Sequence, residues 1–353
     1  MKTRSLKLIA FLVFSQLLSA CSNISYLAQG TSGHLALMER REPISELLQG
    51  DTLSPKRREQ IIAVQNIRAF AYDRLKLPKN NSYSSFIEIE KEALTWNIVA
   101  TKKYSINPIE TCFPIGGCVS YLVYFKKERA EKEAEKHRKL GHDVHLIASP
   151  AYSTLGFWDD PVVSTMFRGN ISSTAEVIFH ELAHQRLIRK NSSAFNEAFA
   201  SAVGEEGTRL WLQKHRPELL KRYNDHIKKR WQFFNLLLTT SEELRAFYKD
   251  KKSEAELAKG KERIFSGLKN RYAALKKSWG GDKRFDRWFT KHPLNNAKLA
   301  VIGVYYRLVP DFSKRLKAFD YDFEKFYQYY ELNKDKLENK KSIKALHKFQ
   351  NRF

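Results

Sequence analysis

The sequence predicts an α+β fold with a helical C-terminal half, because its strand-like segments all lie in the first half. Residues 94–101 and 119–125 are rich in β-branched and aromatic side chains, and residues 142–149 alternate polar with apolar ones. Beyond Pro217 the chain shows only long helical patterns rich in Lys, Glu, Leu and Phe. With 42% hydrophobic residues among 353, it has material for a packed core, which excludes a disordered or collagen-like chain.

Helical spacing defines the other elements expected in the first half. A charged helix is expected over residues 126–140, where Gly141 would end it. Residues 34–77 are also expected to be helical, and Pro78 stops that run. The apolar side chains that give this segment its helical period include Ile61, Val64, Ile67 and Ala71.

The first 21 residues are predicted to be a signal peptide. A basic start precedes a short apolar run, and small residues follow it, which fits a secretory signal better than a spanning helix. The ending Leu18-Ser19-Ala20-Cys21 resembles a bacterial lipobox, so we expect Cys21 to carry lipid and anchor the chain to a membrane. A plain signal peptide with an incidental cysteine is the alternative. Because Ser22 follows the cysteine, we expect the protein to be anchored in the outer membrane of a Gram-negative bacterium, where it faces the periplasm.

The remaining chain shows no internal repeat and no clear linker. We therefore expect a single domain over residues 22–353, with a core over 22–216 and a helical lobe over 217–353. Mean hydropathy is −0.51, and the one long apolar run is the N-terminal one, which excludes a polytopic membrane protein.

Cys112 and Cys118 are expected to form a disulfide. They flank a segment with one proline and two glycines, which favours a tight turn, and an exported chain meets an oxidising compartment. A metal site is less favoured there, because the spacing is not that of a CxxC pair and no histidine is near in sequence.

The formal net charge of +23 indicates an anionic counter-surface. Export argues against nucleic acid as a partner, so anionic lipid headgroups or cell-wall polymers are the expected ones. The alternative is that the lysine and arginine side chains only solvate helix faces.

One segment contains candidate metal ligands and a candidate catalytic base. His180 and His184 are four residues apart in an expected helix, so both imidazoles project from one face and suit a single tetrahedral zinc ion. Glu181 lies beside them, where it can act as a base without being a ligand. Ser173 is expected to cap this helix, with Glu176 completing a capping box.

A third ligand is expected from the next helix. The metzincin pattern would need Gly at 187 and His at 190, but the chain has Leu187 and Lys190, which excludes that subclass. A turn at residues 191–193 precedes a second expected helix at 194–200. Two antiparallel helices of this length would bring Glu197 level with the histidine pair. Glu205 and Glu206 are the alternatives: either could be the third ligand, or could lie next to the ligands without binding the ion.

These motifs resemble a family of bacterial proteins classed as zinc aminopeptidases, most of them lipoproteins. The resemblance covers most of the mature chain and rests on His180 to Gln185 (HELAHQ), residues 194–197, 112–118, 151–156, 159–161, 295–297 and 309–310. It implies a gluzincin-like peptidase with a zincin-like metallopeptidase core and an active-site helix. The order Phe157-Trp158 reverses the one that the family favours, which leaves the metal site untouched.

The resulting hypothesis is a zinc-dependent peptidase, preferably an aminopeptidase, that acts on peptide substrates with Glu181 as general base. An oxyanion donor is expected from Tyr305, Tyr306 or Tyr152. An acid for the substrate amine is expected from Asp159, Asp160, Glu205 or Glu206, although residues 159–161 also fit a turn; without it the enzyme would be an endopeptidase. Residues 142–149 offer an edge strand for substrate backbone. The alternative function is a non-catalytic envelope-binding lipoprotein with a structural or vestigial zinc site.

Overall fold

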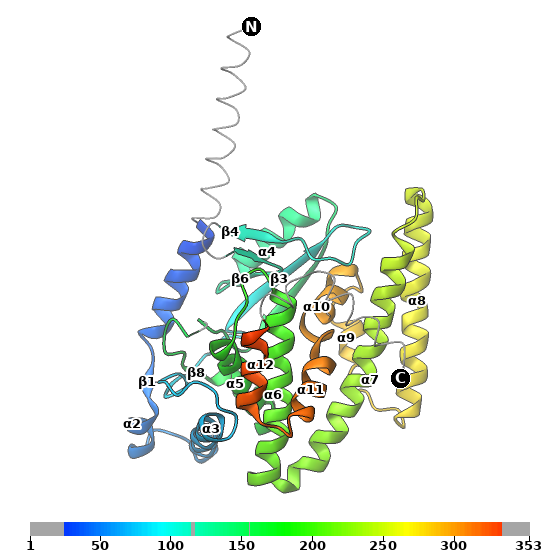
Figure 1. Ribbon diagram of the computed structural model, residues 1–353. Coiled ribbons are helices and arrows are strands. Elements are labelled where there is room, and N and C mark those ends of the chain that lie inside the picture. The colour runs from blue at the N-terminus through cyan, green and yellow to red at the C-terminus, as the bar shows by residue number, and fades with distance from the viewer. Residues whose placement is uncertain (1–24, 114–116, 155, 334–353) are drawn as a thin grey trace, which may run out of the picture.

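The computed structural model describes residues 25–113, 117–154 and 156–333 (Figure 1). The signal peptide and lipidated Cys21 predicted from the sequence lie outside these residues, so both stay predictions. Within the described residues, no helix is both long and apolar enough to cross a bilayer.

The main sheet is small and antiparallel. Its central strand, β3 (Thr95–Thr101), pairs with β6 (Leu122–Tyr124) on one side and with β7 (Asp143–Ser149) on the other. The strands expected over 94–101 and 142–149 are thereby confirmed, and β7 is an edge strand as expected.

The strand expected over 119–125 is wrong as one element. Its first residue ends β5 (Gly117–Val119), which pairs with β4 (Thr111–Phe113), and the chain then bends before β6 begins. Cys112 and Cys118 face each other across the β4–β5 pair and form the predicted disulfide. Because of this bend, Tyr121 lies between the two strands and outside the strand pairing.

The helix expected over 34–77 is also interrupted. A helix that includes residues 25–38 is followed by β1 (Glu42–Pro43), α2 (Ile44–Gln49) and α3 (Pro55–Asp73). Proline at 55 starts α3 because its missing N–H costs nothing at a helix N-terminus, where the Ser54 side chain accepts from the Arg57 N–H. The apolar face predicted for this segment is confirmed, since Ile61, Val64, Ile67 and Ala71 are fully buried.

Two further short strands complete the β structure. β2 (Ser85–Ile87) pairs antiparallel with β1 and parallel with β8 (Val162–Val163), which leads into a short 3₁₀ helix, η1 (Ser164–Arg168). Strands of two or three residues show no periodic pattern, and the sequence did not predict this sheet.

Helices cover both faces of the main sheet. On one face, Ala130 and Ala134 of α4 (Lys127–Lys139) pack against Ile98 and Ala100. This helix and its end at Gly141, which has φ +74°, were predicted. On the other face, Ala297 and Ala300 pack against Val99. They belong to α10 (Asn296–Tyr306), so a helix from the second half of the chain covers a sheet from the first.

The centre of the molecule is an antiparallel helix pair, α5 (Ile171–Arg186) and α6 (Ser193–His215) (Figure 1). Gly204 allows the two helices to approach closely, because a Cβ there would lie 2.8 Å from the Glu176 backbone oxygen of α5. The capping box expected at Ser173 is wrong. The helix begins three residues earlier and is capped by Asn170, whose side chain accepts from the Ser173 N–H at 3.0 Å.

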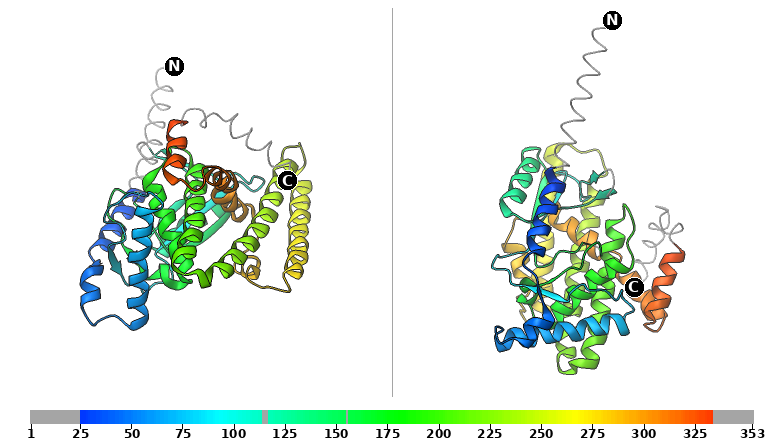
Figure 2. Two further views of the ribbon diagram at one scale, coloured as in Figure 1. Left: turned by 60° about the horizontal axis from the view of Figure 1, so that its bottom comes forward. Right: turned by 90° about the vertical axis from the view of Figure 1, so that its left-hand side faces the viewer.

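The second half is helical as predicted. It comprises α7 (Pro217–Phe247), α8 (Glu254–Ser278), α9 (Asp286–Thr290), α10, α11 (Val309–Ala318) and α12 (Phe323–Leu332). Helices α7 and α8 form a hairpin on the opposite side of the molecule from the N-terminal helices, with α5, α6 and α10 between them (Figures 1 and 2). The fold is therefore α+β, mostly helical with small sheets. The predicted boundary between a core and a lobe at residue 217 stays a prediction.

Candidate metal centre

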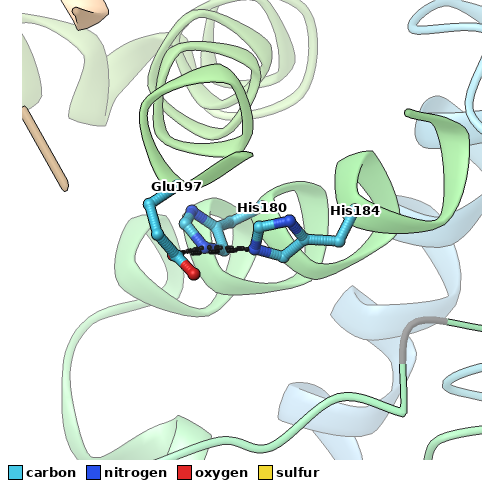
Figure 3. Close-up of side chains that lie close together, drawn as sticks. All are labelled: His180, His184 and Glu197. Carbon is cyan, nitrogen blue, oxygen red and sulfur yellow. Dashed lines mark hydrogen bonds and ion pairs between the residues drawn. The ribbon is translucent and has the colours of Figure 1, made fainter. Parts of the chain in front are cut away.

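The two predicted histidine ligands project from one face of α5. Their Nε2 atoms lie 3.1 Å apart, and Figure 3 shows both rings turned toward the same point. The neighbouring Phe179, Leu182 and Ala183 are fully buried and fix the rotation of the helix. His184 is itself buried, whereas His180 is partly exposed, so the pair is open on one side.

Glu197 of α6 completes the cluster. Its Oε2 lies 3.4 Å from Nε2 of His180 and 3.6 Å from Nε2 of His184 (Figure 3). The connection between the helices is held by the preceding residue, because the Asn196 amide accepts from the Arg189 N–H at 2.8 Å and donates to the Arg189 carbonyl at 2.7 Å. This side-chain bridge fixes where α6 starts, and thereby brings Glu197 level with the histidines as predicted.

The three side chains fit a zinc ion. Bonds of about 2.0–2.2 Å at tetrahedral angles place ligand atoms about 3.3–3.6 Å apart, and the observed separations are 3.1, 3.4 and 3.6 Å. Two imidazoles and a carboxylate are also the ligand set of many catalytic zinc sites, which leave a fourth position for water or substrate. Among the residues that the structure describes, this is the group of metal-ligating side chains close enough to share one ion.

The two imidazoles hold the Glu197 carboxyl in its ionised form. Burial opposes ionisation of Glu197, but the two imidazoles overcome this effect and hold the pKa of its carboxyl well below the ordinary value. Glu197 is therefore ionised at neutral pH, as a metal ligand must be.

Comparison with known proteins identifies the family of this chain. A family model described as "Putative aminopeptidase" matches residues 25–345. The chain belongs to this family. No curated protein and no solved structure matches the chain. The family resemblance inferred from the sequence is thus confirmed.

In this member of the aminopeptidase family, a tyrosine that sequence reasoning missed supports the Glu197 ligand. The Tyr121 hydroxyl donates to Glu197 Oε1 at 2.9 Å, which leaves Oε2 to face the histidines. Burial and the Glu197 charge raise the pKa of Tyr121 well above its ordinary value, so the hydroxyl keeps its proton. Tyr121 lies in the bend between two strands, and its sequence context indicated only a core aromatic.

Replacing Tyr121 by phenylalanine is expected to weaken zinc binding about 10–100-fold, the usual effect of removing a hydrogen bond to a metal ligand. Zinc affinity would be measured by competition with a chelator of known affinity. Tyr124→Phe is the matched control, because Tyr124 packs against α4 on the other face of the sheet. Equal zinc affinity of wild type and Tyr121→Phe would contradict the role assigned to this hydroxyl.

Glu181 lies in α5, directly after His180. It is partly exposed, and its charge affects the pKa of four surrounding groups: Tyr83, Asp160, His184 and Tyr305. His184 belongs to α5 itself, and the other three neighbours come from three separate segments of the chain that meet α5 near Glu181. A carboxylate beside the ligands but outside the ligand set is the arrangement that a general base requires.

The three tyrosines proposed for the oxyanion occupy different places. The Tyr305 ring stacks on His180 with centroids 6.5 Å apart and on Tyr121 with centroids 6.3 Å apart. Tyr306 packs instead between α7 side chains, with its ring 4.2 Å from that of Phe234. Tyr152 packs against Phe125 at 5.0 Å. Of the three, Tyr305 makes the ring contact with a histidine ligand.

The acidic residues proposed to bind the substrate amine also lie in different environments. Asp160 is fully buried, where its carboxylate accepts from the Thr154 N–H and the Ser153 hydroxyl at 3.0 Å. Burial raises the pKa of Asp160 to about 6, against the effect of these hydrogen bonds. Glu205 accepts from Trp231 and pairs with Arg230 at 2.7 Å, and Glu206 pairs with Arg209 at 2.9 Å. Asp159 is partly exposed beside the buried Asp160.

Proposed function

We propose that the protein is a zinc-dependent aminopeptidase that hydrolyses the first peptide bond of its substrates. The observation that carries this proposal is the cluster of His180, His184 and Glu197 with the uncoordinated Glu181 beside it, in a chain of the aminopeptidase family. A purely structural zinc site has no use for such a carboxylate. Zinc in this site would polarise the substrate carbonyl and lower the pKa of a water molecule.

The side chains around the ligands supply the proton transfers. Glu181 is placed to take a proton from the attacking water and to pass it to the departing amine. Tyr305 is placed to donate a hydrogen bond to the oxyanion that develops on the carbonyl oxygen, because its ring contacts a ligand histidine and burial keeps its hydroxyl protonated. Glu197 stays ionised and, held by Tyr121, keeps its geometry during the reaction.

An aminopeptidase also has to recognise the free amine of its substrate. The carboxylates of Asp160, Glu205 and Glu206 are already engaged by hydrogen bonds within the protein. We therefore assign the amine to Asp159, which is partly exposed in the segment that packs over α5, where a Cβ added at Gly156 would lie 3.4 Å from the Gln185 side chain.

The proposal is tested with purified protein and pairs of peptides that differ only in N-acetylation. We expect one zinc ion per chain, cleavage of the free-amine peptide, and no cleavage of its acetylated partner. Chelation is expected to abolish activity, and added zinc to restore it. Equal cleavage of both peptides would instead indicate an endopeptidase. Bound zinc without turnover on any peptide would contradict the proposal and favour the non-catalytic alternative.

A further inference from the structure

A cavity of about 920 Å³ lies beside the metal centre, between α7, α10, α11 and the start of α6. Three residues that line the cavity lie close in sequence to residues at the metal site. Ser120 precedes Tyr121, Val304 precedes Tyr305, and Ala194 lies one helical turn before Glu197. The metal ligands themselves do not line it. The cavity therefore adjoins the metal site behind Tyr121 and Tyr305, and its volume is in the range of known ligand pockets.

The cavity combines apolar walls with arginine side chains. Ile106, Leu299 and Phe312 are buried and supply apolar surface. Arg245 of α7 and Arg307, the residue after α10, also line the cavity. The other charged side chains that line it are two cations and two carboxylates: Lys314, Arg315, Glu110 and Asp311. The arginine pair is only partly buried, with 20% and 27% of the two side chains exposed, so a ligand that enters can reach both guanidinium groups.

The arginine pair carries more positive charge than its partner neutralises. Both guanidinium groups bind the same carboxylate, that of Glu242, with Arg307 Nη2 at 2.7 Å from Oε1. The further contact of Arg245 is to the neutral amide oxygen of Asn107 at 3.4 Å. Burial and the nearby Arg245 lower the pKa of Arg307, as expected for a cation with too little opposite charge around it.

We propose that this cavity binds a carboxylate of the peptide substrate, together with an apolar side chain next to it. Guanidinium groups bind carboxylates in a planar, two-bonded geometry, and the apolar walls would cover the neighbouring side chain. The carboxylate is either the C-terminal one of a short peptide or that of an acidic side chain. This inference rests on the proposed peptidase function, because it takes the ligand to be a peptide substrate.

Gly303 lines the cavity without a side chain, so a larger residue there would reduce the cavity volume. This offers a test that leaves all charges in place. Gly303 lies within α10, and a Cβ added there would meet only Arg307 Nη2, at 3.7 Å. Leucine at this position would project into the open volume. Because glycine is unfavourable inside a helix, Gly303→Leu should not weaken the fold.

The experiment measures peptide binding by calorimetry to the zinc-loaded, full-length Glu181→Gln protein, so that no substrate is consumed. The probes are the tetrapeptide Ala-Leu-Ala-Phe, its C-terminal amide, and the amide of Ala-Leu-Glu-Phe. We expect at least one carboxylate-bearing probe to bind at least 10-fold more tightly than the plain amide. Tighter binding of the first probe indicates a C-terminal carboxylate, and tighter binding of the third an acidic side chain.

Variants of cavity residues test whether the tighter binding of carboxylate-bearing probes arises in the cavity. Arg307→Met is expected to abolish the preference for the carboxylate, and Gly303→Leu to weaken binding of all three probes. Arg271→Met is the matched control, since Arg271 pairs with Glu243 of α7 and does not line the cavity. A preference that survives Arg307→Met would mean that Arg307 does not bind the carboxylate, and equal binding of all probes would mean that no such site exists. Either result overturns this inference, while peptide hydrolysis by wild type tests the proposed function separately.

Discussion

Glu181→Gln is expected to lower the turnover of peptide substrates about 10²–10⁴-fold, the range that a general base contributes. Glutamine has nearly the same shape as glutamate but cannot accept a proton from water. Glu181 is partly exposed and outside the ligand cluster, so we expect zinc affinity and stability to stay within experimental error of wild type. Steady-state kinetics on a free-amine peptide and zinc content measured on the same samples would check both expectations.

Glu206→Gln provides the matched control for this substitution. It makes the same chemical change on the adjacent helix, where Glu206 pairs with Arg209 rather than facing the ligands. Its turnover should stay within about twofold of wild type, because an ion pair near the surface contributes little. Loss of activity in both variants would point to a general effect of charge. A Glu181→Gln protein with wild-type turnover would remove the proton-transfer role from this residue.

Local pattern accounts for the part of the site that could be predicted. His180 and His184 share a helix, so their spacing alone fixes their relation to each other. Glu197 required one further step, the length of the turn between two antiparallel helices, and the structure confirms that Glu197 meets the histidines. Both arguments use chain segments shorter than 20 residues, over which helix geometry is regular.

Tertiary contacts account for what the sequence did not reveal. Tyr121 reaches Glu197 only because the strand expected over 119–125 is bent, and nothing in its composition indicates that bend. The helix cap is Asn170 rather than Ser173 because several residues in that segment can cap a helix, and packing decides among them. The position of Tyr305 depends on α10 crossing the sheet, a contact between segments about 200 residues apart.

A buried charge network ties the helical half to the two helices that carry the ligands. Arg230 of α7 bonds Glu176 of α5 and Glu205 of α6, each at 2.7 Å. The Trp231 indole donates to Glu205 at 2.9 Å, and the Tyr223 hydroxyl donates to Glu176 at 3.2 Å. Glu176 lies one turn before His180, so this network holds α5 and α6 together next to the metal centre.

Arg230→Ala is therefore expected to lower the free energy of unfolding by about 3–5 kcal/mol, the usual cost of removing one partner from a buried ion pair. The loss is large because two mostly buried carboxylates would lose their shared cation: 23% of the Glu176 side chain and 11% of the Glu205 side chain are exposed. Urea denaturation of the zinc-free protein would measure it without a contribution from metal binding.

Two comparisons separate the buried charges from a simple loss of arginine. Arg271→Ala removes an arginine from a more exposed pair, with 41% and 43% of its two side chains exposed, and should cost at most about 1 kcal/mol. Adding Glu176→Gln and Glu205→Gln to Arg230→Ala should restore part of the lost stability, because neutral amides are less costly to bury than unpaired carboxylates. If Arg230→Ala costs no more than Arg271→Ala, packing rather than this network joins α7 to the helices that bear the ligands.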